Sequence, residues 1–262
     1  MGRLRHSAPD WCFAKEGELP PEEYYRRVRE AGCTAAELVG RPRRAAAREA
    51  GLDILSVAAP GMQEGLNRRE NHDRLLADIA STIAEAAEDG LRQVVVFSGN
   101  RDGVGPGEGL ENCVRALRRL APLAGEAGVR LTFEMLNSHD HPGYQADSAG
   151  FGLRVAREVA SPAVGILYDV YHLARMGRPT DQIIADVSEN IEALAHVHVA
   201  GCPGRGFPGP EQRIDYRRIV AALLEAGYEG YVGYEFLPGD DPLGELAEAV
   251  RLFEGYAEEP RG

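Results

Sequence analysis

The sequence has one lysine, Lys15, among its 29 basic residues, so arginine supplies nearly all of its positive charge. A Schiff-base aldolase needs a lysine amine in a desolvated pocket. Lys15 stands beside Glu16 and Glu18, a setting typical of a solvated surface, which argues against that chemistry. The basic residues are outnumbered by 41 acidic ones, and the formal net charge is −12. Nucleic-acid phosphates bind basic surfaces, so we expect no nucleic-acid partner.

Cysteine is also scarce, and the four residues present show no CxxC spacing of the kind that binds zinc or forms a disulfide framework. No apolar stretch approaches the ~20 residues that cross a bilayer, and the N-terminal residues lack the apolar run of a signal peptide. We therefore expect a protein of the reducing cytoplasm with no membrane partner. The 262 residues are 44% hydrophobic, which is ordinary for a globular protein with a sizeable core.

Eight strand-like segments alternate with helical ones along the chain, with short connections and no change of composition that would mark a linker. Alternating strands and helices indicate parallel βαβ units, and eight units in about 250 residues predict a single (β/α)₈ TIM barrel over residues 1–262. A doubly wound open sheet would show a phosphate-binding glycine turn after its first strand, and none is present there. The expected strands are Ser7–Phe13, Ala35–Val39, Leu52–Ala58, Gln93–Phe97, Val129–Met135, Val164–Asp169, the start of Leu194–Gly204, and Tyr231–Phe236.

Polar side chains stand near the carboxyl ends of the last four expected strands. They are Glu134, Asp169, His198 and Glu235, separated by 35, 29 and 37 residues, each about one βα unit. Active sites of such barrels lie at the carboxyl ends of the strands, so these groups are expected to converge. Three converging carboxylates would repel one another, and a divalent cation removes that repulsion. Each residue alone is more typical of a structural group, but the four in register favour a metal site. The oxygen-rich set suits Mn²⁺, Mg²⁺ or Co²⁺, with Zn²⁺ as a further option.

Four stretches resemble the xylose-isomerase-like barrel superfamily of sugar isomerases and epimerases, and most of all its hydroxypyruvate isomerase-type members. The matching stretches are FEMLNSHDHPGYQ, LYDVYHLARMG, HVHVAGCPGRGFPG and GYEGYVGYEFLP. Through this resemblance the metal ligands match onto the same four residues, and His172 and Arg205 match positions that contact substrate oxygens. His139 and Tyr144, after the fifth strand, are expected to line the pocket mouth, although an ordinary surface loop is an equal alternative.

The resemblance implies isomerisation of hydroxypyruvate to tartronate semialdehyde through an enediolate, with Glu134 and Glu235 as the acid–base pair. His198 leaves the substrate open, because this position is His in ketose epimerases of the superfamily and can be Gln in hydroxypyruvate isomerases. A ketose 3-epimerase and an inosose dehydratase-type lyase are therefore alternatives. An apurinic endonuclease is disfavoured by the acidic charge. A non-catalytic barrel that binds a sugar or a metal is the alternative of another class. The expected partners are a small sugar or keto acid, and a second copy of the chain in a homodimer or homotetramer.

Overall fold

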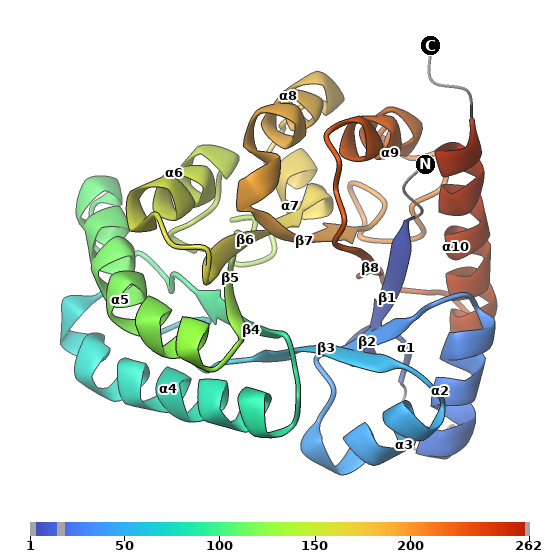
Figure 1. Cartoon of the computed structure of the whole chain (residues 1–262). Coiled ribbons are helices and arrows are strands. Elements are labelled where there is room, and N and C mark those ends of the chain that lie inside the picture. The colour runs from blue at the N-terminus through green and yellow to red at the C-terminus, as the bar shows by residue number, and fades with distance from the viewer. Residues whose placement is uncertain (1–3, 15–18, 260–262) are drawn as a thin grey trace. The chain divides into compact units, whose positions relative to one another are not determined.

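A computed structural model describes residues 4–14 and 19–259 of the chain (Figure 1), so Lys15 lies outside the described residues. The hydrogen-bonded order of the strands follows the sequence from β1 to β8 and closes into a barrel, which confirms the predicted fold class. The strands are β1 (Arg5–Pro9), β2 (Ala35–Glu37), β3 (Asp53–Ala58), β4 (Gln93–Phe97), β5 (Arg130–Glu134), β6 (Val164–Asp169), β7 (Leu194–Val199) and β8 (Tyr231–Tyr234).

Helices follow the strands along the chain. They are α1 (Asp10–Phe13), α2 (Pro21–Glu30), α3 (Arg44–Glu49), α4 (His72–Glu88), α5 (Pro106–Glu126), α6 (Ala149–Val159), α7 (Val170–Arg175), α8 (Thr180–Asn190), α9 (Tyr216–Glu225) and α10 (Pro242–Glu258). Short 3₁₀ turns occupy Arg41–Arg43, Arg69–Asn71 and Ile191–Ala193. In the described part of the chain, no helix combines the length and the apolar character that a membrane span requires.

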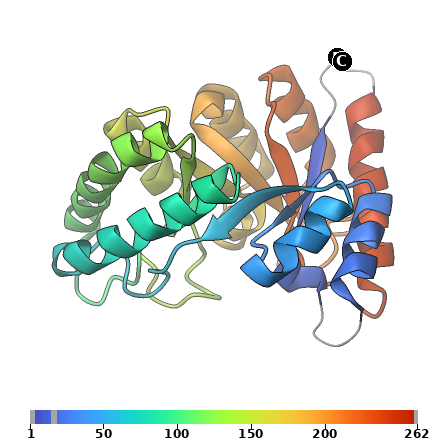
Figure 2. The same ribbon diagram turned by 60° about the horizontal axis from the view of Figure 1, so that its bottom comes forward.

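The chain forms two compact units. The first comprises Met1–Leu55, Gly177–Ile191 and His196–Gly262, and the second comprises Ser56–Met176 and Glu192–Ala195. In the first unit, β1 pairs in parallel with β2 and β8, and β7 pairs in parallel with β8. Helix α10 lies beside α9 and α2 in this unit (Figures 1 and 2).

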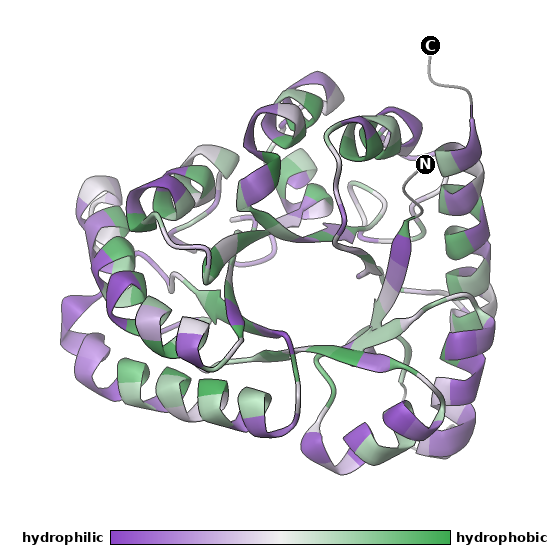
Figure 3. Cartoon of the chain, in the orientation of Figure 1, coloured by the Kyte–Doolittle hydropathy of each residue, from purple (hydrophilic) through white to green (hydrophobic). Residues whose placement is uncertain are grey.

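In the second unit, β4 pairs in parallel with β3 and β5, and β5 pairs in parallel with β6. Helices α4 and α5 pack side by side (Figures 1 and 2), and both show alternating hydrophilic and hydrophobic colours along their length in Figure 3. The buried side chains of α4 include Leu75, Leu76, Ile79 and Ile83, whose spacing forms one apolar helical face.

Local differences from the sequence-based expectation concern the ends of some elements and two short helices, α1 and α7. The expected first strand Ser7–Phe13 is wrong in its second half, because β1 ends at Pro9 and Asp10 begins the short helix α1. The sequence predicts a helix from about Leu110 to Ala127; the observed α5 begins about one turn earlier, at Pro106, since a proline suits the first helical position. The short helix α7 was not expected; its N-cap Asp169 accepts hydrogen bonds from two backbone N–H groups of its first turn.

Candidate active site

The second unit brings together Glu134, Asp169 and His172. Glu134 and Asp169 are the last residues of β5 and β6, and His172 lies in α7. Each residue offers one ligand-type atom, and these atoms lie within 4.8 Å of one another. All three residues are buried. Two buried carboxylates this close together supply the oxygen ligands that a divalent cation such as Mg²⁺ or Mn²⁺ prefers.

Asp169 is held by the start of α7. Its Oδ1 accepts hydrogen bonds from the backbone N–H groups of Tyr171, at 2.8 Å, and His172, at 3.2 Å. Its Oδ2 lies 3.5 Å from His172 Nε2. The N-cap interaction therefore fixes one carboxylate oxygen on the helix and turns the other toward the cluster.

His172 is oriented by Asn137. The backbone N–H of Asn137 donates to His172 Nδ1 at 3.1 Å, and the Asn137 side-chain nitrogen lies 2.6 Å from the same atom. An imidazole nitrogen that accepts from an amide N–H carries no proton, so the neutral ring is protonated at Nε2. The Nε2–H group faces the cluster and can donate to a ligand oxygen. This geometry suits the substrate-binding role expected for His172.

Asn137 also organises the loop after β5. Its side-chain amide donates to Asp140 Oδ2 at 2.8 Å, and the Tyr171 hydroxyl donates to the same oxygen. Burial acts to raise the pKa of Asp140, but the hydrogen bonds from Tyr171 and Asn137 outweigh it and hold that pKa below its ordinary value. Asp140 is thus an ionised anchor that ties Asn137 to α7.

Of the two residues expected at the pocket mouth, His139 lies at the surface and Tyr144 in the interior. His139 is exposed, and its backbone N–H donates to Asn137 Oδ1 at 3.0 Å. Tyr144 is fully buried; its hydroxyl accepts from the Ser98 N–H and donates to the Glu134 carbonyl oxygen, both at 3.0 Å. Burial raises the pKa of Tyr144, so the phenol stays neutral. Tyr144 therefore supports the backbone that carries Glu134.

The first unit brings together Glu37, His196, His198 and Glu235. Glu37 Oε2 lies 2.9 Å from His196 Nε2 and 2.8 Å from His198 Nε2. The other nitrogen of His198, Nδ1, lies 3.1 Å from Glu235 Oε2. Both imidazoles lie on one side of β7, as its two-residue period predicts, with ring centroids 4.7 Å apart. His198 thus sits between two buried carboxylates.

The charges of this group follow from its packing. Burial acts to lower the pKa of His198, but Glu235 and Glu37 outweigh burial and raise it well above its ordinary value. Burial acts to raise the pKa of Glu37, but the charges of His196 and His198 hold it well below its usual range. Burial lowers the pKa of His196, and the charge of His198 lowers it further against the opposing effect of Glu37. Glu37 is therefore a carboxylate that faces both imidazoles.

Glu235 follows β8 and has donors on both carboxylate oxygens. The indole N–H of Trp11 donates to its Oε1 at 2.9 Å, and the guanidinium of Arg205 donates to its Oε2. The Arg205 guanidinium also lies 5.1 Å from the centroid of the Trp11 ring, within cation–π distance. The structure thus brings Arg205 to Glu235 and adds Trp11, for which the sequence alone suggests an apolar pocket wall or a core position.

Glu37 and Asn137 are the two polar residues of these clusters that the sequence did not single out. Glu37 stands in the middle of the expected strand Ala35–Val39, whereas β2 ends at Glu37 itself. With that end placed correctly, Glu37 would have joined the carboxylates that close the other strands. Asn137 follows the carboxylate strand β5 by three residues, but its sequence carries no signal of the hydrogen bond to His172.

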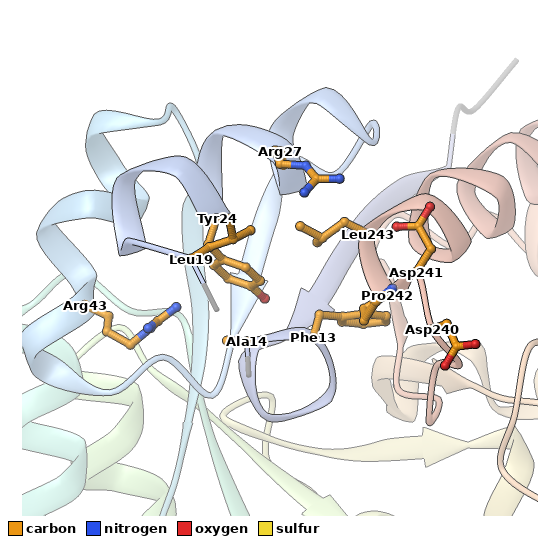
Figure 4. A pocket seen from close by; sticks show the side chains of 10 residues that line it. All are labelled: Phe13, Ala14, Leu19, Tyr24, Arg27, Arg43, Asp240, Asp241, Pro242 and Leu243. Carbon is orange, nitrogen blue, oxygen red and sulfur yellow. The ribbon is translucent and has the colours of Figure 1, made fainter. Parts of the chain in front are cut away.

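One cavity of about 260 Å³ lies in the first unit, between α1, α2 and the start of α10 (Figure 4). Apolar side chains of Phe13 and Leu243 line it together with Arg27, Arg43 and Asp240. None of the site residues predicted from the sequence lines this cavity. Its mixture of both charge signs gives no chemical indication of a substrate.

Residues 25–255 match the protein family described as xylose isomerase-like TIM barrel. The chain belongs to this family. It is 33% identical over 204 residues to a Streptomyces coelicolor protein that carries the provisional name hydroxypyruvate isomerase, covering 73% of this chain and 70% of that protein. It is 27% identical over 125 residues to hydroxypyruvate isomerase of Escherichia coli K12, covering 48% of this chain and 47% of that protein.

Among solved structures, the crystal structure of a family 2 AP endonuclease from Brucella melitensis matches this member of the family with a TM-score of 0.82. The match covers 95% of this chain and 98% of that one, at 21% sequence identity. At this identity the likeness shows a shared fold and nothing about activity.

Proposed function

We propose that this chain is a divalent-metal-dependent isomerase of a small hydroxy-carbonyl compound, and that it converts hydroxypyruvate to tartronate semialdehyde. The observation that carries the proposal is the pair of buried carboxylates Glu134 and Asp169, whose ligand-type oxygens lie within 4.8 Å of each other and beside His172. The 33% identity to the Streptomyces coelicolor relative supports hydroxypyruvate as the substrate.

We propose Glu134, Asp169, His198 and Glu235 as the metal ligands. In (β/α)₈ barrels the carboxyl ends of all strands contribute to one active-site face, which supports a single site built from these strand ends. Three carboxylates and one imidazole suit Mn²⁺, Mg²⁺ or Co²⁺. When bound, such an ion polarises the carbonyl group of the substrate and stabilises the negative charge that develops on its oxygens.

The protein's own residues then move the protons. Isomerisation of hydroxypyruvate removes a proton from C3 and delivers a proton to C2, while the hydroxyl proton on O3 is lost and O2 gains one. We assign the carbon-to-carbon transfer to Glu134 and Glu235 as base and acid. His172, protonated at Nε2, donates a hydrogen bond to a substrate oxygen and orients the reacting carbons. Arg205 provides the positive charge that a substrate carboxylate requires.

One residue favours a second candidate function. His198 occupies a position that is His in ketose epimerases of the xylose-isomerase-like superfamily. A ketose 3-epimerase is therefore the alternative enzyme. An epimerase would return the proton to the opposite face of the same carbon. A dehydratase-type lyase and a non-catalytic binding barrel are the outcomes to which failure of both activities would point.

The deciding experiment is proton NMR in deuterated buffer with purified protein and Mg²⁺, which avoids paramagnetic broadening by Mn²⁺. With hydroxypyruvate, the proposal predicts loss of the C3–H signal and appearance of tartronate semialdehyde, both abolished by a chelator. Exchange only at C3 of a ketose would instead establish the epimerase. No exchange with hydroxypyruvate or any ketose of a simple panel would contradict both enzymatic functions.

We also propose that residues 1–262 form one barrel domain that acts on small molecules in the cytoplasm as a homodimer or homotetramer. The family match over residues 25–255 supports the single domain. Light scattering coupled to size-exclusion chromatography measures the oligomeric state, and a monomer at micromolar concentration would contradict that part of the proposal.

A further inference from the structure

Glu37 is a buried carboxylate that the proposed reaction does not use. Only 1% of its surface is exposed. Its Oε2 lies within 3 Å of the Nε2 atoms of both His196 and His198. We propose that Glu37 is a positioning residue that fixes the His198 imidazole and thereby tightens metal binding. This inference rests on the metal site of the proposed function, and it assigns a role to a residue that touches neither the ion nor the substrate.

The two ring nitrogens of His198 contact two different carboxylates. Nε2 lies 2.8 Å from Glu37, and Nδ1 lies 3.1 Å from Glu235, a proposed ligand. A histidine ligand commonly donates its second N–H to a carboxylate, which fixes the tautomer and ring orientation and makes the ligating nitrogen more basic. Glu37 holds the proton on Nε2, which leaves Nδ1 as the ligating atom on the side of Glu235.

His196 keeps Glu37 in place from the other side. Its Nε2 atom lies 2.9 Å from the same Glu37 oxygen, on the side opposite the hydrogen bond to His198. The carboxylate oxygen is therefore enclosed by two imidazoles that stand two residues apart on one strand, which restricts its orientation. Because both rings belong to β7, the position of Glu37 is coupled directly to the strand that carries His198.

Gly233 leaves the space that this arrangement needs. It pairs with His198 in the register of β7 and β8. A Cβ atom at Gly233 would lie 2.3 Å from Glu37 Oε1 and 2.7 Å from His198 Cδ2, both closer than real contacts allow. Any side chain at this position would crowd both Glu37 and His198. The glycine thus permits the close approach of carboxylate and imidazole.

The test is a Mn²⁺ titration of the full chain, with free Mn²⁺ measured by electron paramagnetic resonance. The wild type is compared with Glu37→Gln and with the control Asp186→Asn. Asp186 is another buried carboxylate; it lies in α8 and pairs with Arg178 in the preceding loop. The wild type should bind one Mn²⁺ per chain. Glu37→Gln should raise the dissociation constant about 10–100-fold, and Asp186→Asn should leave it unchanged. Circular dichroism establishes that each variant is folded.

Gly233→Ala is the second variant, because it preserves every charge while its Cβ crowds the Glu37 carboxylate most closely and the His198 ring next. It should weaken Mn²⁺ binding in the same direction, and it tests the inference even where Glu37→Gln fails to fold. A folded Glu37→Gln variant with a dissociation constant within about twofold of the wild type would overturn the positioning role, since a purely structural residue would change stability and leave affinity unaltered. Two Mn²⁺ per wild-type chain, reduced to one by Glu37→Gln, would make Glu37 a ligand and would also overturn it. Absence of Mn²⁺ binding by the wild type would refute the metal site of the proposed function itself.

Discussion

Replacing Asp10 with asparagine should remove a pH dependence of stability that the structure assigns to this residue. Asp10 is buried at the start of α1, where its Oδ2 accepts from the Tyr25 hydroxyl and from Arg43 Nε at 3.2 Å. Burial raises the pKa of Asp10 from 3.8 to about 6, against the opposing hydrogen bonds from Tyr25 and Arg43. The folded protein therefore holds the proton of Asp10 more tightly than the unfolded chain does.

The sign and size of the effect follow from proton linkage. Because the folded pKa is raised, Asp10 contributes stability that is fully present below about pH 4 and is lost as the pH rises through about 6. A shift of about 2.2 units corresponds to about 3 kcal/mol over the whole window, an upper value. Integration with the same two pKa values places about 2 kcal/mol of this loss between pH 4.5 and pH 7.5.

Urea denaturation of the wild type and Asp10→Asn at pH 4.5, 5.5, 6.5 and 7.5 measures this contribution. The unfolding free energy of the wild type should fall relative to that of the variant by up to about 2 kcal/mol across the series. Tyr25→Phe serves as a matched variant: it deletes a hydrogen bond that lowers the pKa of Asp10, so its loss of stability should extend to higher pH. Parallel curves for the wild type and Asp10→Asn would refute the assigned pKa.

Three further substitutions test the proposed site. Glu235→Gln preserves the shape of the side chain and removes its ability to take a proton, so kcat should fall about 10²–10⁴-fold with the fold intact; near-normal turnover would remove Glu235 from the mechanism. His172→Ala removes the Nε2–H donor, so KM should rise roughly 2–10-fold, and an unchanged KM in steady-state assays would contradict its role. Tyr144→Phe leaves the Ser98 N–H and the Glu134 carbonyl without the phenol, so urea denaturation should show a loss of roughly 1–3 kcal/mol; an unchanged midpoint would show that water replaces the hydroxyl.

The ends of a strand could be predicted from the sequence where a buried apolar run has a clear start and a clear end. Strands β4 and β6 match their expected bounds, because each is a short buried run between a helix and a polar residue or turn. The two helices that the sequence did not predict, α1 and α7, have only 4 and 6 residues. A helix of one or two turns shows no apolar periodicity, so only its cap could reveal it. For α7 that cap is Asp169, which we had interpreted solely as a metal ligand.

Some residues of the proposed site could be predicted from the sequence, whereas the contacts that orient them could not. Glu134 and Asp169 could be predicted to approach each other, because the ends of neighbouring parallel strands meet at one edge of the sheet. The contacts of His172 with Asn137, and of His198 with Glu37, join side chains 35 and 161 residues apart. No local pattern encodes such pairs, since they depend on side-chain orientation after the strands have assembled. The sequence therefore predicted the carboxylates better than the groups that orient the imidazoles.

Trp11 and Phe13 show how the type of an element decides which residues reach the site. Side chains two residues apart lie on the same face of a strand, so both would share one environment if the expected strand Ser7–Phe13 had formed in full. In a helix the same spacing turns them by about 200°, so they face nearly opposite directions. Phe13 accordingly is buried and packs edge-on against Phe236, with ring centroids 5.1 Å apart. Trp11 remains 48% exposed and donates to Glu235. The change from strand to helix at Asp10 therefore gives one aromatic residue to the core and the other to the proposed active site.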